Sequence, residues 1–256
     1  MDYFTINEHA YRIMRVLHAM EVEEISNFDL ENITDWLNMA AGVEQVRIIT
    51  ERYDSSIYFC GSALAYSDEK SKLWSELCAE LVTFNFIWGS LESLILKLVA
   101  RKNKTSTTYL GREFLTANYK EPSIEGYLET YSILYKTLGK ELSGKVLKNI
   151  ENEHYAAKGL YLVSKLRNQF AHGSRLLPIP DDWSDGLIKE VDMIRMSSRI
   201  VLLTIQMLLI SQYGSNRYII EDPVLFDFDE LEEPVSLDAL IKNLHLQDYD
   251  VRISMK

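Results

Sequence analysis

The residues best suited to acid–base chemistry lie together in residues 160–174, which read LYLVSKLRNQFAHGS. This stretch contains Arg167, Asn168 and His172, and Gly173 follows at once. Apolar residues at helical spacing predict a helix here, and a glycine just past the last of them is a common helix stop. A guanidinium is permanently charged, whereas an imidazole exchanges protons near neutral pH. The pair therefore suits the handling of a phosphate group.

The spacing of this pair fits a helix that ends at the histidine. Five residues at about 100° each do not stack Arg167 directly on His172, but a long guanidinium can lean across that gap. The imidazole would then lie in the last helical turn, where the helix dipole favours a cation.

The pattern Arg167-Asn168-x-x-x-His172 resembles the R-x4-6-H signature of the HEPN superfamily, including the polar residue that often follows the arginine. The resemblance covers residues 73–214. It implies an antiparallel all-α bundle, and in many members a metal-independent endoribonuclease. By this resemblance His172 is the general base or acid, Arg167 stabilises the transition-state charge, and Asn168 holds the phosphate or fixes the imidazole.

The same resemblance implies partners and a setting. HEPN sites usually form where two protomers join their motif helices, so we expect a homodimer that cleaves single-stranded RNA in the cytoplasm. Toxin–antitoxin and antiviral defence systems contain many such proteins, and an antitoxin or another regulatory protein is a further expected partner. Some HEPN toxins carry a tyrosine two positions after the histidine, where an antitoxin nucleotidylates it. Ser174 occupies that position here, which argues against that mode of control.

Other residues can assist this site. Glu92 lies on the clearest predicted helix. An acid on the first core helix of HEPN domains often faces the motif, so by this resemblance Glu92 can orient Arg167 or His172. The alternative is that Glu92 is a solvated surface acid. Candidate RNA-binding cations are Arg101, Lys102, Lys104 and Arg175. A charge run beyond a helix end is more often simply solvated.

Two alternatives to a nuclease remain. Arg167 can pair with an acid while His172 merely ends a helix, in an unrelated helical protein. The chain can also be a catalytically inactive HEPN-like binding or regulatory module. Burial and separate pairing of the two side chains would favour the module, whereas a nuclease needs both to face one open, positive groove.

The hydrophobic pattern predicts helices along most of the chain. We expect an N-terminal, mostly helical extension (1–66), a HEPN-like helical core (67–216) and an acidic C-terminal tail (217–256). The expected helices span 6–22, 33–41, 67–102, 122–138, 141–172 and 186–213, with a break in the fifth near Gly144 or Gly159. Residues 43–59 are ambiguous, since their β-branched residues suit a strand while Val43, Val46 and Ile49 fall at helical spacing; we favour a helix. The sequence RYII (217–220) suits a short strand.

Two aromatic patterns in the predicted core have alternative meanings. Phe84 and Trp88 belong to an apolar helical stripe, for which packing is the favoured interpretation. Tyr127, Tyr131 and Tyr135 recur every four residues and can stack on unpaired bases, but packing against a neighbouring helix is again favoured.

Composition excludes several classes of protein. The net charge of −11 argues against a general duplex-DNA binder, and most of the excess acidity lies in residues 221–256. Two cysteines without metal or redox spacing indicate a reduced setting. The apolar run IVLLTIQMLLI is too short to cross a bilayer, so we expect a buried helix and no membrane contact. No histidine has a helical partner for a metal, and no nucleotide-binding motif is present, so no metal or cofactor is expected.

Overall fold

The computed structural model describes residues 2–53, 61–99, 105–180, 190–214, 218–220 and 235–247. Within these ranges the chain forms nine α-helices and one pair of two-residue strands, which confirms the all-α class. The finer HEPN-like arrangement of the bundle stays a prediction.

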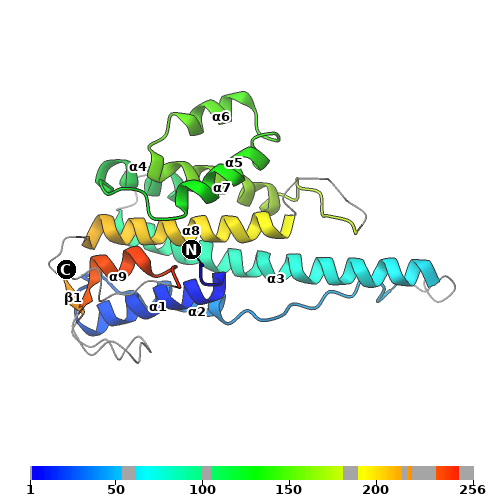
Figure 1. The fold of residues 1–256 in the computed structure, drawn as a ribbon, viewed down its shortest axis with the longest axis horizontal. Helices are drawn as coiled ribbons and strands as arrows, with labels where there is room; N and C mark the ends of the chain where they lie inside the picture. Colours follow the sequence, from blue (N-terminus) through cyan, green and yellow to red (C-terminus); the bar gives the residue numbers. More distant parts are fainter. Residues whose placement is uncertain are drawn as a thin grey trace.

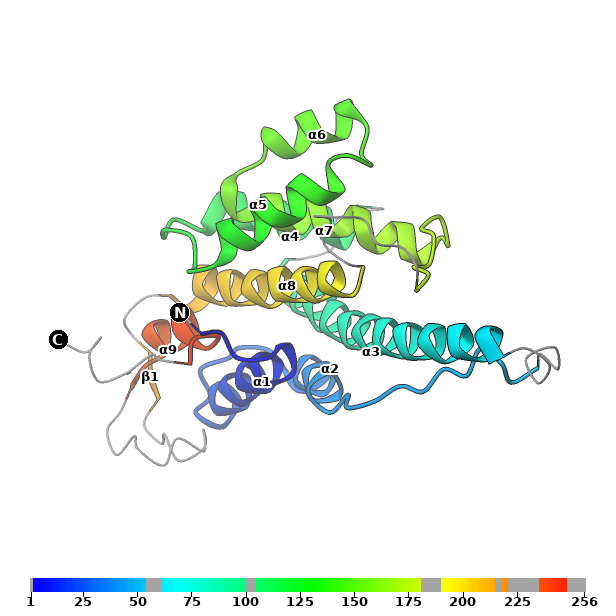
Figure 2. The same ribbon diagram turned by 45° about the vertical axis from the view of Figure 1, so that its right-hand side comes forward.

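The fold is built around helix α8 (Glu190–Tyr213), whose residues are buried on nearly every side. One layer contains α1 (Ile6–Val22), α2 (Glu31–Ala41) and α3 (Gly61–Leu98). The other contains α4 (Thr107–Asn118), α5 (Tyr127–Leu138) and α7 (Tyr155–Ala171), with α6 (Gly144–Glu151) outside it. Figures 1 and 2 show α8 between these layers. This position explains its all-round apolar sequence.

The C-terminal part of the chain returns to the bundle. Strand β1 (Ile219–Ile220) pairs antiparallel with β2 (Val235–Ser236), which confirms the predicted short strand, and α9 (Leu237–Asn243) follows and packs on α8. One hydrophobic core extends from Ile6 to Leu244. The division into extension, core and tail stays a prediction.

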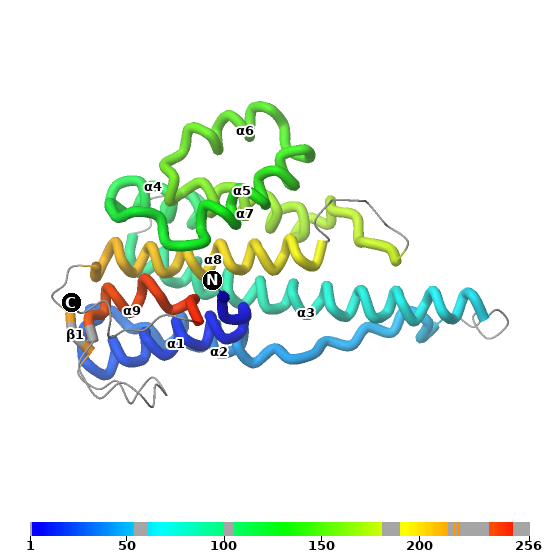
Figure 3. Tube along the Cα trace, viewed as in Figure 1, coloured from blue at the N-terminus to red at the C-terminus, as the bar shows by residue number. Residues whose placement is uncertain are grey.

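Residues 43–53 correct the helix predicted at 43–59. They form an extended segment and a turn, while 54–60 lie outside the described residues. The Ile48 amide donates to Ser75 Oγ (2.9 Å) and the Thr50 amide to Ser71 Oγ (3.0 Å). Serines spaced four apart on α3 thus satisfy the backbone of this extended segment, which Figure 3 shows running beside α3. A helix would offer those amides no such partners.

Helix boundaries were predicted with mixed success. The bounds of α1 are confirmed, and its last residue, Val22, is 56% exposed. The buried face of α1 includes His9 and Ile13. Helix α2 begins two residues early and α3 six residues early, and α5 begins only after Gly126, whose positive φ of 72° interrupts the predicted start.

The predicted motif helix 141–172 is two helices, α6 and α7, separated at residues 152–154. The break does not fall at Gly159. This glycine lies inside α7, where the Tyr127 side chain packs against it. A Cβ on Gly159 would lie 2.6 Å from the Tyr127 hydroxyl. That hydroxyl accepts from the Gly159 amide (3.0 Å) and donates to the Ala156 carbonyl (2.9 Å).

Helices α3 and α8 are long and apolar enough to span a membrane by length and composition. In the most apolar part of α8, 83% of the residues are buried within the fold, against 44% for α3.

Candidate functional site

Helix α7 ends where the sequence predicts. Gly173 has a φ of +62°, its amide donates to the Phe170 carbonyl (3.1 Å), and the Ser174 amide donates to the Gln169 carbonyl (2.9 Å). This is the Schellman pattern, which satisfies carbonyls that a helix end leaves free. His172 is the capping residue, so its side chain leaves the helix at its C-terminal end.

The side chains of His172 and Asn168 are exposed. Neither forms a side-chain hydrogen bond or ion pair with any other residue that the structure describes. Both imidazole nitrogens are therefore open to a ligand.

Arg167 is half-buried and forms no ion pair within the described ranges. Its guanidinium carbon lies 5.9 Å from the centre of the Trp88 ring on α3, at the limit of a cation–π contact. Trp88 is only 4% exposed and Phe84 is 2% exposed, which confirms their predicted core role. Arg167 thus lies beside Trp88, and its hydrogen-bond donors have no acceptor among the described residues.

Glu92 lies on α3 one turn beyond Trp88 and is half-buried. Among the described residues it forms no hydrogen bond or ion pair with Arg167 or His172. The predicted orienting contact is therefore not made. Nor does any hydrogen bond join Arg167 to His172, so the structure places the two on one helix end without coupling them.

Arg175 has a structural role in place of the predicted RNA contact. Its guanidinium donates to Glu141 (2.6 Å) and Glu190 (3.0 Å), and its side chain is only 7% exposed. It also donates to the Gln169 side chain of α7 (3.2 Å). Arg175 therefore fixes the segment that follows His172 against α8 and the α5–α6 turn. The other predicted cations, Arg101, Lys102 and Lys104, lie outside the described residues.

The tyrosine stripe belongs mainly to the fold, as predicted. Tyr127 is fully buried, and burial raises its pKa. Tyr135 donates to Glu151 (2.7 Å), which ties α5 to α6, and stacks beside Tyr131 with ring centres 5.6 Å apart.

Sequence reasoning missed a second polar centre, inside the core. His9 accepts from Arg199 Nη1 at Nδ1 (2.8 Å) and donates from Nε2 to Gln206 Oε1 (2.8 Å). The Gln206 amide donates to His245 Nδ1 (3.5 Å), and His245 Nε2 donates to the Glu125 carbonyl (3.1 Å). The one available signal was Gln206, a polar residue within the apolar run of α8.

Burial and the charge of Arg199 lower the pKa of both histidines in this centre: well below the ordinary range for His9 and to about 4 for His245. Both are therefore neutral at neutral pH, and in this neutral form each ring donates from Nε2 and accepts at Nδ1. Within the described ranges no group of three or more histidine, cysteine or acidic side chains is arranged to hold a metal ion.

No family model, curated protein or solved structure matches this chain.

Proposed function

We propose that this protein is a metal-independent endoribonuclease of the HEPN type that cleaves single-stranded RNA at the C-terminal end of α7. The observation that carries the proposal is the state of Arg167 and His172. One permanent cation and one exposed imidazole lie on the same helix end, and neither is paired with a described residue. A buried structural arginine would normally have such partners.

The expected reaction is a transesterification within the RNA backbone. The ribose 2′-oxygen attacks the adjacent phosphorus and the P–O5′ bond breaks, leaving a 2′,3′-cyclic phosphate and a 5′-hydroxyl. His172 takes the 2′-hydroxyl proton, or gives a proton to the departing 5′-oxygen. Arg167 binds the extra negative charge on the phosphorane-like transition state, and Asn168 holds a phosphate oxygen.

A single copy supplies one imidazole, whereas the reaction uses both a base and an acid. A homodimer that brings two α7 ends together would supply the second one. We propose this dimer as the active form, in the cytoplasm, restrained by a partner protein in a toxin or defence system. These parts rest on the family resemblance alone.

The test is cleavage of a labelled single-stranded RNA in EDTA by the wild type, His172→Ala and Arg167→Ala. Loss of a general acid–base group costs about 10²–10⁴-fold in rate, and loss of a transition-state donor about 10²–10³-fold. Matched controls are His18→Ala and Arg52→Ala, which alter exposed residues distant in sequence from α7. Cyclic-phosphate ends from the wild type and both controls, but from neither α7 variant, would support the proposal. Equal cleavage by all five proteins would place the activity elsewhere.

A catalytically inactive binding or regulatory module is the second candidate. It is favoured by a cavity of about 630 Å³ that none of the motif residues lines. Absence of cleavage, with RNA bound as tightly by His172→Ala as by the wild type, would support this second function.

A further inference from the structure

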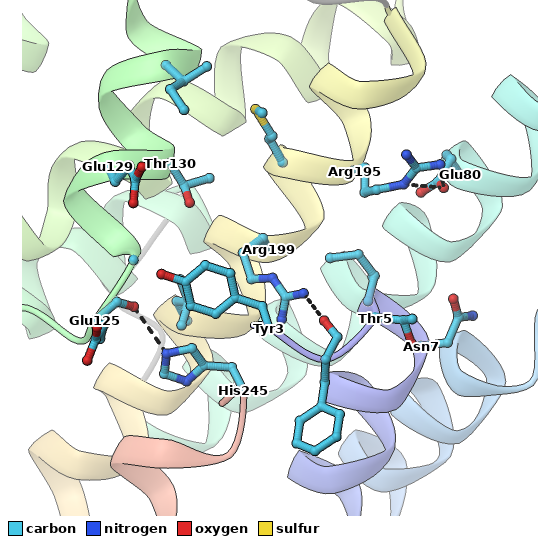
Figure 4. A pocket seen from close by; sticks show the side chains of 16 residues that line it. Tyr3, Thr5, Asn7, Glu80, Glu125, Glu129, Thr130, Arg195, Arg199 and His245 are labelled. Atoms are coloured by element: carbon cyan, nitrogen blue, oxygen red, sulfur yellow. Dashed lines mark hydrogen bonds and ion pairs between the residues drawn. The ribbon is translucent and has the colours of Figure 1, made fainter. Parts of the chain in front are cut away.

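The large cavity lies between the N-terminal segment, the first turns of α5 and the middle of α8 (Figure 4). Its volume of about 630 Å³ falls within the range of small-molecule sites. Ile133, Met196 and Leu203 supply apolar lining. The cavity can therefore enclose the apolar body of a small organic molecule.

Arg199 lies at the centre of this cavity in Figure 4. Two of its five N–H groups are engaged, one with the Phe4 carbonyl and one with His9 Nδ1. The remaining three have no acceptor among the described residues, and no described carboxylate forms an ion pair with this guanidinium. A half-buried charge without a counter-ion is less stable than one that a ligand neutralises.

The immediate neighbours of Arg199 cannot neutralise it. His9 and His245 are neutral members of the hydrogen-bonded chain that begins at Arg199. The Tyr3 ring lies 5.9 Å from the guanidinium carbon and stacks on His245, with ring centres 5.8 Å apart. Burial and the nearby acids Glu129 and Glu125 raise the pKa of Tyr3, so its phenol is neutral as well. The floor of the cavity therefore carries one uncompensated positive charge.

The rim of the cavity, unlike its floor, carries negative charge. Glu125 and Glu129 line the cavity, are exposed, and form no ion pair with any described residue. A third rim acid, Glu80, is paired with Arg195 (2.7 Å). A phosphate dianion would be repelled by the two free carboxylates, whereas a molecule with one carboxylate and one ammonium group would meet a complementary charge at each end.

We propose that this cavity binds a small apolar zwitterion, such as a hydrophobic amino acid or dipeptide. Its carboxylate pairs with Arg199, its ammonium group faces Glu125 and Glu129, and its apolar side chain lies along Ile133 and Met196. This site is separate from the α7 end and does not depend on the proposed nuclease.

The test is calorimetric titration of the full chain with L-phenylalanine and with the dipeptide leucyl-phenylalanine. Two further probes each lack one charge: hydrocinnamate has no ammonium group, and phenethylamine has no carboxylate. We expect at least one zwitterion to bind about 10-fold or more tightly than either single-charge probe, as charged hydrogen bonds imply.

Two substitutions separate the two ends of the site. Arg199→Gln keeps a hydrogen-bond donor at this position and should weaken zwitterion binding by about 10-fold or more. Glu129→Gln, at an exposed position that does not threaten folding, should weaken zwitterion binding but leave hydrocinnamate binding unchanged or stronger. Glu44→Gln is the matched control, because Glu44 is also exposed and lies outside the cavity.

Three results would overturn the proposal. These are no binding of either zwitterion at millimolar concentration, equal binding by the wild type and Glu129→Gln, or binding of phenethylamine as tight as that of L-phenylalanine. The first result would remove the site itself, the second the contact of the ammonium group, and the third the contact of the carboxylate.

Discussion

The buried histidines make the stability of this protein depend on pH in a defined direction. His245 has its pKa lowered to about 4, against an ordinary value of 6.5, because it is buried beside Arg199. In the unfolded chain the imidazole returns to the ordinary value, so between these two values the unfolded state binds more protons. The stability of the fold is therefore complete above about pH 6.5 and falls as the pH falls toward 4.

The magnitude follows from the two pKa values. One pKa unit corresponds to about 1.4 kcal/mol, so His245 alone should remove about 2 kcal/mol of unfolding free energy between about pH 7.5 and about pH 5. His9, whose pKa is lowered even when bonded to Gln206, acts in the same direction. Most carboxylates remain ionised over this interval, so the histidines dominate the change.

The assay is equilibrium urea unfolding at several pH values within this interval, for the wild type and His245→Gln. The glutamine amide can still accept from Gln206 and donate to the Glu125 carbonyl, but it does not titrate. The loss of stability on acidification should therefore be about 2 kcal/mol smaller in His245→Gln than in the wild type.

The matched control is His18→Gln, since His18 is exposed and lies outside the hydrogen-bonded chain that joins Arg199 to Glu125. If His245→Gln and the wild type lose equal stability on acidification, His245 is not held neutral by burial, and the assigned hydrogen-bond directions are wrong.

Three further predictions concern packing and backbone, and urea unfolding measures each of them. Gly159→Ala should cost about 1–3 kcal/mol, because the new methyl would lie 2.6 Å from the Tyr127 hydroxyl and 2.8 Å from Ile200. Adding Tyr127→Phe should recover part of this loss. If the two substitutions are purely additive in the double variant, the contact is contradicted. Tyr127→Phe alone should cost about 0.5–1.5 kcal/mol, since it removes the hydrogen bonds of the hydroxyl with the Gly159 amide and the Ala156 carbonyl. Gly173→Ala should cost about 1 kcal/mol because of its positive φ, whereas Gly144→Ala, with open space around it, should cost nothing; equal effects would argue against the left-handed helix stop.

Local signals in the sequence were sufficient for several elements. Helix α1 has the predicted bounds because Thr5 caps the Glu8 amide (3.2 Å) and the apolar spacing behind it is regular. The stop of α7 at Gly173 was also predictable, since that glycine adopts the left-handed conformation that few other residues tolerate. In both cases the deciding groups lie within a few residues of one another.

The predictions that failed depend on contacts between residues that lie far apart in the sequence. Residues 43–53 are extended because serines on α3, more than twenty residues later, accept from Ile48 and Thr50. The polar centre joins His9 to Gln206 across 197 positions, so no spacing rule could find it. At the candidate nuclease site the sequence indicated the residues on α7 but not the pairing of Arg175, which depends on acids from two other elements.

The two ends of the described chain lie side by side, and this affects when the protein can finish folding. The Phe4 amide donates to the His245 carbonyl (3.0 Å), and the Gln247 amide donates to the Asp2 carbonyl (3.0 Å). During synthesis the Phe4 amide therefore waits for His245, and until α9 emerges from the ribosome Gln206 lacks its partners Ile241 and His245. Such long-range closure slows folding. We expect the bundle to reach its final packing only after residues 241–247 have emerged from the ribosome.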